Sequence, residues 1–180
     1  MAPTTTTKTV KGSPVRGETV TSPRAEVEAN AEQPKEAPTK KKWSDITDSI
    51  DKATFDQILE MDDDDDQDFS KGIVFGFFDQ AESTFEKMEK AQKEENLKEL
   101  SQLGHFLKGS SATLGLSKVK EACEKIQHFG NQKDETGSTD EPDDKISLKN
   151  IEKTLSEVKK DYEEVETFLR RYYDDPVSCN

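Results

Sequence analysis

His105 is one of two histidines in this chain of 180 residues, and small residues surround it. On a helix with 100° per residue it lies opposite an apolar stripe of leucines, which are Leu97, Leu100, Leu103, Leu107 and Leu114. Its own face carries Ser101 and Gly109, each one turn away. Glycine costs a helix about 1 kcal/mol relative to alanine, so Gly104 and Gly109 indicate that another molecule needs close access to the imidazole. This arrangement suits a nucleophile that a second protein must reach.

The other histidine, His128, offers a comparison. It also lies away from the apolar positions of its helix, and its expected neighbours are the charged residues Glu121, Glu124 and Lys125. No small residues thin the helix around it. We therefore interpret His128 as an ordinary surface residue and His105 as the candidate nucleophile.

Three segments in the right order resemble the fungal histidine-containing phosphotransfer (HPt) proteins, which are intermediates of multistep His–Asp phosphorelays. They are residues 105–116 (HFLKGSSATLGL), residues 123–130 (CEKIQHFG) and the upstream residues 55–73, which include MDDDDDQDFSKGI. The resemblance is strong over residues 49–130 and looser over the last long helix. The pattern H-x-x-K-G-S alone is a modest signal, but the flanking segments make it specific.

The resemblance assigns a role to several residues near the candidate nucleophile. It implies that His105 accepts the phosphoryl group, that Lys108 places its ammonium near the phosphoryl oxygens, and that Gly109 leaves room for the incoming group. Ser110 and Gln127 match family positions next to the site. A hydrogen bond there between the third and fourth helices would orient the local structure.

Imidazole chemistry fits such a carrier, since an ordinary pKa of about 6.5 leaves the ring largely neutral and nucleophilic near pH 7. The chain has no glycine-rich phosphate loop and no ATP-binding motif, so we expect no kinase activity of its own. Whether the carrier is an enzyme in its own right stays open. We expect no cofactor in this chain, because the family's receiver partners supply the Mg²⁺-binding acidic pocket.

Docking of receiver domains is expected to use apolar side chains of the first two helices. Ile58, Met61, Phe69 and Ile73 match family positions that form such a patch. Thr54 lies where the family often has an aliphatic residue, so this part of the rim is expected to differ. The alternative interpretation is that these side chains only hold the first helix against the bundle.

The charge and composition of the chain argue against several classes of function. Residues 1–42 carry a net charge of +3 and residues 43–180 a net charge of −16. An acidic domain repels phosphate backbones, so nucleic-acid binding is not expected. No apolar run is long enough to cross a membrane. Two cysteines, Cys123 and Cys179, form no disulfide framework, which favours a reducing location in the cytoplasm and nucleus.

Composition predicts a disordered tail over residues 1–42, which holds five of the seven prolines. The resemblance implies that residues 43–180 form an HPt helical domain. The predicted fold is all-α: an antiparallel four-helix bundle with a short additional N-terminal helix. Asp68 or Ser70 is expected to cap the second helix. The expected helices cover residues 51–61, 69–92, 95–114, 117–131 and 146–173.

Two other functions are alternatives to the phosphotransfer interpretation. A non-catalytic acidic helical adaptor fits the periodicity and the charge equally well, although it leaves the small residues around His105 unexplained. A metal-binding bundle needs inward-facing Glu and His ligands, and the run of aspartates at residues 62–66 lacks the glycine and glutamate of a calcium loop. We therefore expect no metal site. The resemblance further implies a monomer, because family members carry the whole acceptor site in one chain.

Overall fold

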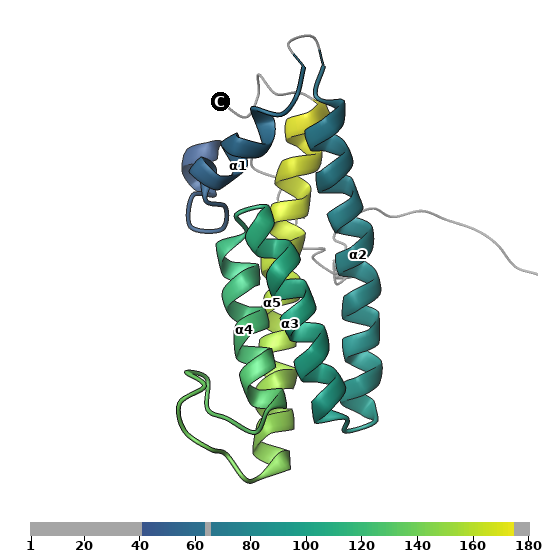
Figure 1. Cartoon of the computed structure of the whole chain (residues 1–180), viewed down its shortest axis with the longest axis vertical. Helices are drawn as coiled ribbons and strands as arrows, with labels where there is room; N and C mark the ends of the chain where they lie inside the picture. Colours follow the sequence, from purple (N-terminus) through teal and green to yellow (C-terminus); the bar gives the residue numbers. More distant parts are fainter. Residues whose placement is uncertain (1–40, 64–65, 175–180) are drawn as a thin grey trace, which may run out of the picture. The chain divides into compact units, whose positions relative to one another are not determined.

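The computed structural model describes residues 41–63 and 66–174, and regular structure within them is helical. The elements are η1 (Trp43–Asp45), a short 3₁₀ helix, and α1 (Lys52–Leu59), α2 (Asp68–Lys93), α3 (Leu97–Thr113), α4 (Ser117–Gly130) and α5 (Asp144–Asp174) (Figure 1). The five α-helices correspond to the five predicted ones. The prediction of an all-α fold is confirmed.

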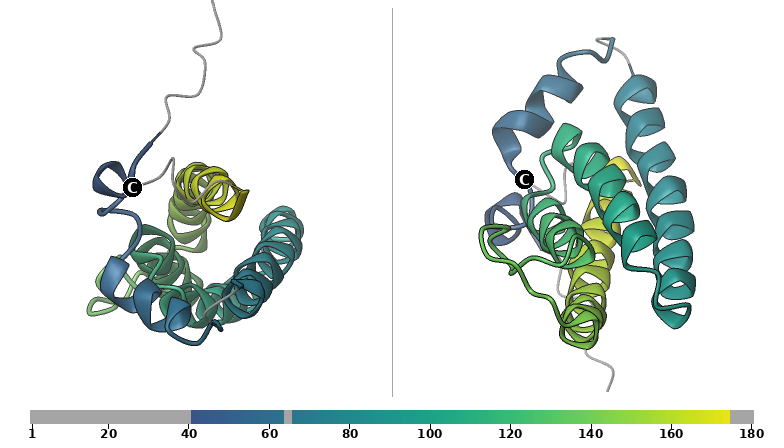
Figure 2. Two further views of the ribbon diagram at one scale, coloured as in Figure 1. Left: turned by 90° about the horizontal axis from the view of Figure 1, so that it is seen from above. Right: turned by 60° about the horizontal axis from the view of Figure 1, so that its bottom comes forward.

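The long helices α2 to α5 form the bundle because each has one apolar face. Along α5 the apolar residues that recur every three or four positions from Ile151 to Tyr172 are buried. On α2, Phe78 and Phe85 pack against the ring of Tyr162 on α5. Figure 2 shows the four helices around a common interior. The predicted four-helix bundle with a short additional helix is confirmed.

A segment before α1, residues 43–50, also belongs to the core, although the sequence pattern predicts no element there. Trp43, Ile46 and Ile50 are buried. The Trp43 ring packs edge-on against Phe168 of α5, with 4.9 Å between ring centroids, and it also contacts Phe55 of α1. These contacts hold η1 and α1 at one end of the bundle.

The α3–α4 turn anchors the same end. Gly115 has φ +71°, in the left-handed region that glycine tolerates best. Its carbonyl accepts a hydrogen bond from the Asp51 N–H at 2.7 Å, and the Ser117 N–H donates to the Ser49 carbonyl at 3.0 Å. These two hydrogen bonds join the segment before α1 to the turn that follows the helix carrying His105.

Aspartates of the α1–α2 connection cap α2, and the prediction that Asp68 or Ser70 provides the cap is wrong. The Ser70 N–H donates to Oδ1 of Asp62 at 2.7 Å, and the Asp68 N–H donates to Oδ1 of Asp66 at 3.2 Å. The first N–H groups of a helix have no partner within the helix, and a carboxylate there also faces the positive end of the helix dipole. Asp62 and Asp66 thus stabilise the start of α2.

Apart from Lys41 and Lys42, the tail predicted over residues 1–42 lies outside the described residues, so its disorder stays a prediction. Nζ of Lys41 lies 2.6 Å from Oε1 of Glu164 on α5. Within residues 41–63 and 66–174, none of the helices has the length and apolar character needed to cross a membrane.

Candidate functional site

His105 is exposed on α3, as the helical pattern predicts. Leu100 and Leu107 on the same helix, with Leu114 just beyond its end, are fully buried, so the imidazole faces away from the core. An exposed ring can be reached by a macromolecule without any opening of the bundle.

Gly104 does not serve access to the imidazole, and that part of the sequence interpretation is wrong. A Cβ at Gly104 would lie 2.9 Å from both the Cys123 carbonyl oxygen and the Gln127 backbone nitrogen on α4. Ser101, one turn before His105, is likewise buried, and its hydroxyl donates to the Gln127 carbonyl at 3.1 Å. The small residues Ser101 and Gly104 therefore let α3 and α4 approach closely.

Gly109 lies on an open surface of α3, and its role in admitting a phosphoryl group stays a prediction. It is exposed, and a Cβ built on it would meet no atom within 4 Å. Since no packing contact calls for a glycine here, the missing side chain leaves the helix surface open one turn beyond His105. Phe106, beside His105, is 49% exposed, an apolar surface residue that the helical wheel did not single out. Its signal in the sequence was an aromatic residue on the polar side of an amphipathic helix.

Lys108, three residues after His105, forms an ion pair across the α3–α4 interface. Its Nζ lies 3.3 Å from Oε1 of Glu124, and the two side chains are 25% and 44% exposed. The Lys108 ammonium therefore has a carboxylate partner on α4, and its role toward a phosphoryl group on His105 stays a prediction. Periodicity on either helix alone could not reveal this pair.

Ser110 and Gln127 do not form the hydrogen bond expected between the third and fourth helices. The Ser110 hydroxyl donates to the Phe106 carbonyl of its own helix at 3.3 Å. Oε1 of Gln127 is buried, and within the described residues it has no hydrogen-bond partner. The bond that joins the two helices at this level comes from Ser101 instead.

Comparison with known proteins supplies the family. The sequence model of the Hpt domain matches residues 73–168, which span α3 and α4 entirely and most of α2 and α5. This chain belongs to the Hpt domain family. The recognition made from residues 105–116 and 123–130 is thereby confirmed.

Several relatives of this Hpt chain are phosphorelay proteins. Over 125 residues it is 47% identical to multistep phosphorelay regulator 1 of Schizosaccharomyces pombe, which covers 69% of this chain and 42% of the relative. Over 77 residues it is 53% identical to the phosphorelay intermediate protein YPD1 of Saccharomyces cerevisiae, covering 42% of this chain and 46% of the relative. The Hpt chain thus matches less than half the length of these curated relatives.

A solved structure agrees with both the fold and the family. It is the co-crystal structure of the S. cerevisiae histidine phosphotransfer signaling protein Ypd1 with the receiver domain of its downstream response regulator Ssk1. The Ypd1 chain is 35% identical to this Hpt chain with a TM-score of 0.63, and the match covers 71% of this chain and 96% of Ypd1.

The four residues expected to form a docking patch do not share one environment. Ile58 is only 6% exposed and belongs to the core, which supports the packing interpretation for this residue. Ile73 is half-buried against the core. Met61 and Phe69 are 62% and 45% exposed. The apolar surface that remains on this Hpt domain near the α1–α2 connection is therefore Met61 and Phe69.

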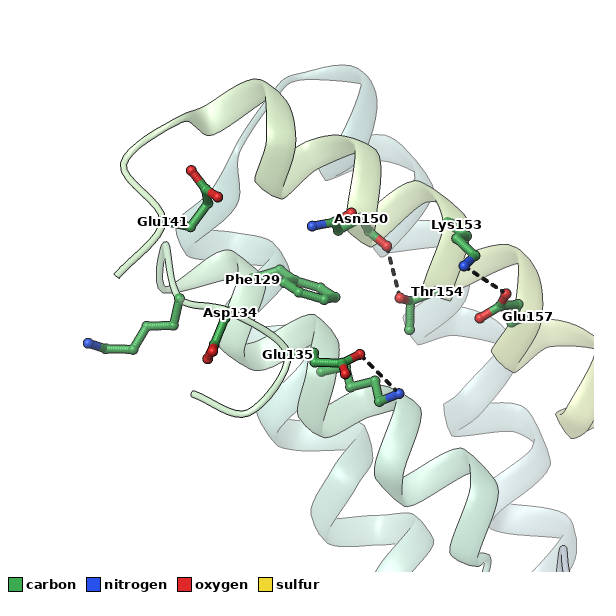
Figure 3. Close-up of a pocket in the computed structure, with 10 residues that line it drawn as sticks. Phe129, Asp134, Glu135, Glu141, Asn150, Lys153, Thr154 and Glu157 are labelled. Atoms are coloured by element: carbon green, nitrogen blue, oxygen red, sulfur yellow. Dashed lines mark hydrogen bonds and ion pairs between the residues drawn. The ribbon is translucent and has the colours of Figure 1, made fainter. Parts of the chain in front are cut away.

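A hollow of about 280 Å³ lies between α4, the loop 131–143 and α5 (Figure 3). Its lysines are paired with carboxylates: Lys125 lies 3.5 Å from Glu135, and Lys153 lies 3.8 Å from Glu157. His105 is not among the lining residues. The candidate nucleophile lies on an exposed helix surface rather than in this hollow, and such a surface suits a protein partner.

His128 is half-buried, and the loop 131–143 contacts its ring, a contact that the helical pattern does not predict. Its Nδ1 lies 3.0 Å from the Glu135 carbonyl oxygen. A Cβ on Gly137, which has φ +72°, would lie 2.8 Å from the His128 Nε2. Both ring nitrogens face loop atoms, and this difference from His105 supports His105 as the reactive histidine.

Cys123 is buried on α4. Burial raises the pKa of the Cys123 thiol to about 12, so the thiol stays protonated and unreactive at neutral pH. In the part of the chain that the structure describes, no three His, Cys, Asp or Glu side chains converge on a metal-sized site.

Proposed function

We propose that this Hpt chain is a phosphorelay intermediate. His105 accepts a phosphoryl group from the receiver domain of a hybrid sensor kinase and transfers it to an aspartate in the receiver domain of a response regulator. The observation that carries the proposal is an exposed His105 one turn from the open surface of Gly109, on the helix that also carries Lys108. The relatives named as phosphorelay proteins, and the complex of Ypd1 with a receiver domain, support it.

The chemistry is nucleophilic transfer in two steps. The lone pair of one imidazole nitrogen of His105 attacks the phosphorus of an aspartyl phosphate, while the second nitrogen carries the ring proton. The N–P bond forms as the P–O bond to aspartate breaks, and the aspartate leaves as a carboxylate. In the second step a carboxylate of the next receiver attacks the phosphorus, and the imidazole leaves.

Phosphoryl transfer depends mainly on positioning and charge stabilisation. We propose that Lys108 faces the phosphoryl oxygens and that Gly109 admits the receiver's active-site loops. Ser110 and Gln127 flank this region on α3 and α4. The Mg²⁺ for the reaction is expected in the receiver's acidic pocket rather than in this chain.

Receiver docking is proposed to use the exposed apolar side chains Phe106, Met61 and Phe69, with Ile73 partly accessible beside them. Exposed aromatic side chains commonly anchor protein interfaces. The net charge of −16 on residues 43–180 favours partners with basic rims.

Transfer from a receiver tests this function. The Ssk1 receiver domain, phosphorylated on its aspartate, is mixed with the native chain or with His105→Gln. Acid-labile, base-stable label on the native chain that is absent from the variant supports His105 as the acceptor. Equal labelling of both would move the acceptor elsewhere, with His128 tested next. If none of several receivers labels the chain, the alternative function of a non-catalytic adaptor would be favoured.

The monomeric state and the cytoplasmic and nuclear location of the protein stay predictions.

A further inference from the structure

The Lys108 ammonium has an anionic partner in the structure, Glu124, and Lys108 lies three residues after His105 on the same helix. Residues three apart on a helix have Cβ atoms about 5–6 Å apart, so Lys108 can reach a group bound to His105. Its Nζ instead lies 3.3 Å from Glu124. Gly104 packs against the backbone of Cys123 and Gln127, which puts the turn that carries His105 level with Glu124 on α4.

Phosphorylation changes which anion the ammonium prefers. A phosphoryl group brings close to two negative charges and three acceptor oxygens, whereas Glu124 offers one charge in a partly exposed pair. The ammonium has three donors but only one positive charge, so its attraction to each anion is weaker when both are bound. Glu124 therefore competes with the phosphoryl group for Lys108.

We propose that Glu124 is a positioning residue that holds Lys108 in the unphosphorylated chain and weakens its hold on the phosphoryl group. This inference rests on the proposed function of His105. In such an arrangement Glu124 keeps the phosphohistidine poised for onward transfer, because it limits how strongly the chain stabilises the phosphorylated form.

The size of the effect follows from the exposure of the pair. Exposed ion pairs contribute at most about 1 kcal/mol, which corresponds to about fivefold in an equilibrium constant. Removing the carboxylate of Glu124 is therefore expected to shift the transfer equilibrium with a receiver about fivefold toward phosphohistidine. The shift acts through Lys108, so it is expected to shrink below about twofold when Lys108 is absent.

The experiment is a double-mutant cycle of Glu124→Gln and Lys108→Gln with two phosphoryl donors. Phosphoramidate labels histidine without any partner, and the initial rate at His105 is counted after proteolysis so that His128 is excluded. The phosphorylated Ssk1 receiver gives the equilibrium distribution of label. Glu121→Gln removes an identical exposed charge from the same helix and is the matched control, and Glu124→Asp is the conservative variant.

When Lys108 is present, Glu124→Gln should be labelled faster by phosphoramidate, and its transfer equilibrium with the receiver should shift toward phosphohistidine. Neither change is expected when Lys108 is replaced by Gln. Glu121→Gln and Glu124→Asp should stay within about twofold of the native chain. Equal shifts with and without Lys108, or the same shift in Glu121→Gln, would overturn the inference, since either result means that only the total charge matters.

Failure of the inference can be told apart from failure of the proposed function. If the effect of Glu124→Gln on phosphoramidate labelling depends on Lys108 but no receiver labels the chain, the role of Glu124 is supported and the phosphorelay function is contradicted. If the receiver labels the chain but the effect of Glu124→Gln is independent of Lys108 with both phosphoryl donors, the phosphorelay function is supported and the role of Glu124 is overturned. Equal thermal stability of Glu124→Gln and Glu121→Gln would show that the effect is not one of bundle packing.

Discussion

The backbone of Gly104 on α3 lies directly against the carbonyl of Cys123 on α4, where an added Cβ would come within 2.9 Å of the oxygen. Real Cβ atoms do not approach backbone oxygens so closely, so any side chain at Gly104 must move the helices apart. Because His105 is the next residue, this contact also sets the position of the imidazole relative to Glu124 and Gln127. The close approach of two helices thus positions the proposed reactive group.

Gly104→Ala is expected to destabilise the bundle. Overpacking typically costs about 1–3 kcal/mol, and the gain in helix propensity returns about 1 kcal/mol of it. Chemical denaturation measures the change. Gly72→Ala on α2 is the control, since its Cβ would meet nothing within 4 Å, and it should raise stability by up to about 1 kcal/mol. Equal effects of the two substitutions would contradict the close packing of α3 and α4.

Gly109→Ala is expected to separate stability from function. The substitution has open space around it, so the free energy of unfolding should rise by about 0.5–1 kcal/mol. Phosphotransfer from a receiver should nevertheless slow several-fold, because the methyl group occupies the surface where the receiver approaches. Denaturation and transfer kinetics on the same sample measure both changes. A variant that is more stable and transfers at the native rate would show that Gly109 lies outside the interface.

Met61→Asp and Ile58→Asp should fail in different ways. Met61 is 62% exposed, so its substitution should change stability by less than about 0.5 kcal/mol while it weakens receiver binding. Ile58 is in the core, and an unpaired buried carboxylate there should cost several kcal/mol and reduce the helical circular dichroism signal. Calorimetric titration with a receiver measures the first effect and thermal melts the second. Unchanged receiver affinity of Met61→Asp would remove Met61 from the docking surface.

Asp134 should keep the loop 131–143 ordered in acid. The Thr136 hydroxyl and the N–H groups of Thr139 and Ser138 donate to its carboxylate, and these bonds lower the pKa of Asp134 to about 2. Because the folded pKa lies below the ordinary value of about 3.9, the stabilisation is complete above that value and is lost as pH falls toward 2.

Amide hydrogen exchange of Ser138 and Thr139 against pH tests this prediction. Protection should persist at pH 4 and weaken as pH approaches 2 in the native chain, whereas Asp134→Ala should lack it throughout. A midpoint near pH 4 in the native chain would show that the hydrogen bonds do not favour the charged carboxylate.

The sequence by itself determined the helices, the core-facing positions and the candidate histidine. These depend on local periodicity: the stripe through Leu100 and Leu107 follows from spacing within one helix, and these leucines are buried as predicted. The exposure of His105 follows from the same wheel. The family could be recognised because its motif is contiguous around His105 and again around Gln127.

Only the tertiary structure decided which contacts are made by the residues that the helical pattern places near the surface. Gly104 meets Cys123, Lys108 pairs with Glu124, and Ile58 enters the core although it could equally have joined a surface patch. Such contacts join residues that are far apart along the chain, and they depend on how closely two helices approach. The pattern of apolar residues on one helix distinguishes its inward face from its outward face. It does not show which neighbouring helix covers the residues that lie between these two faces.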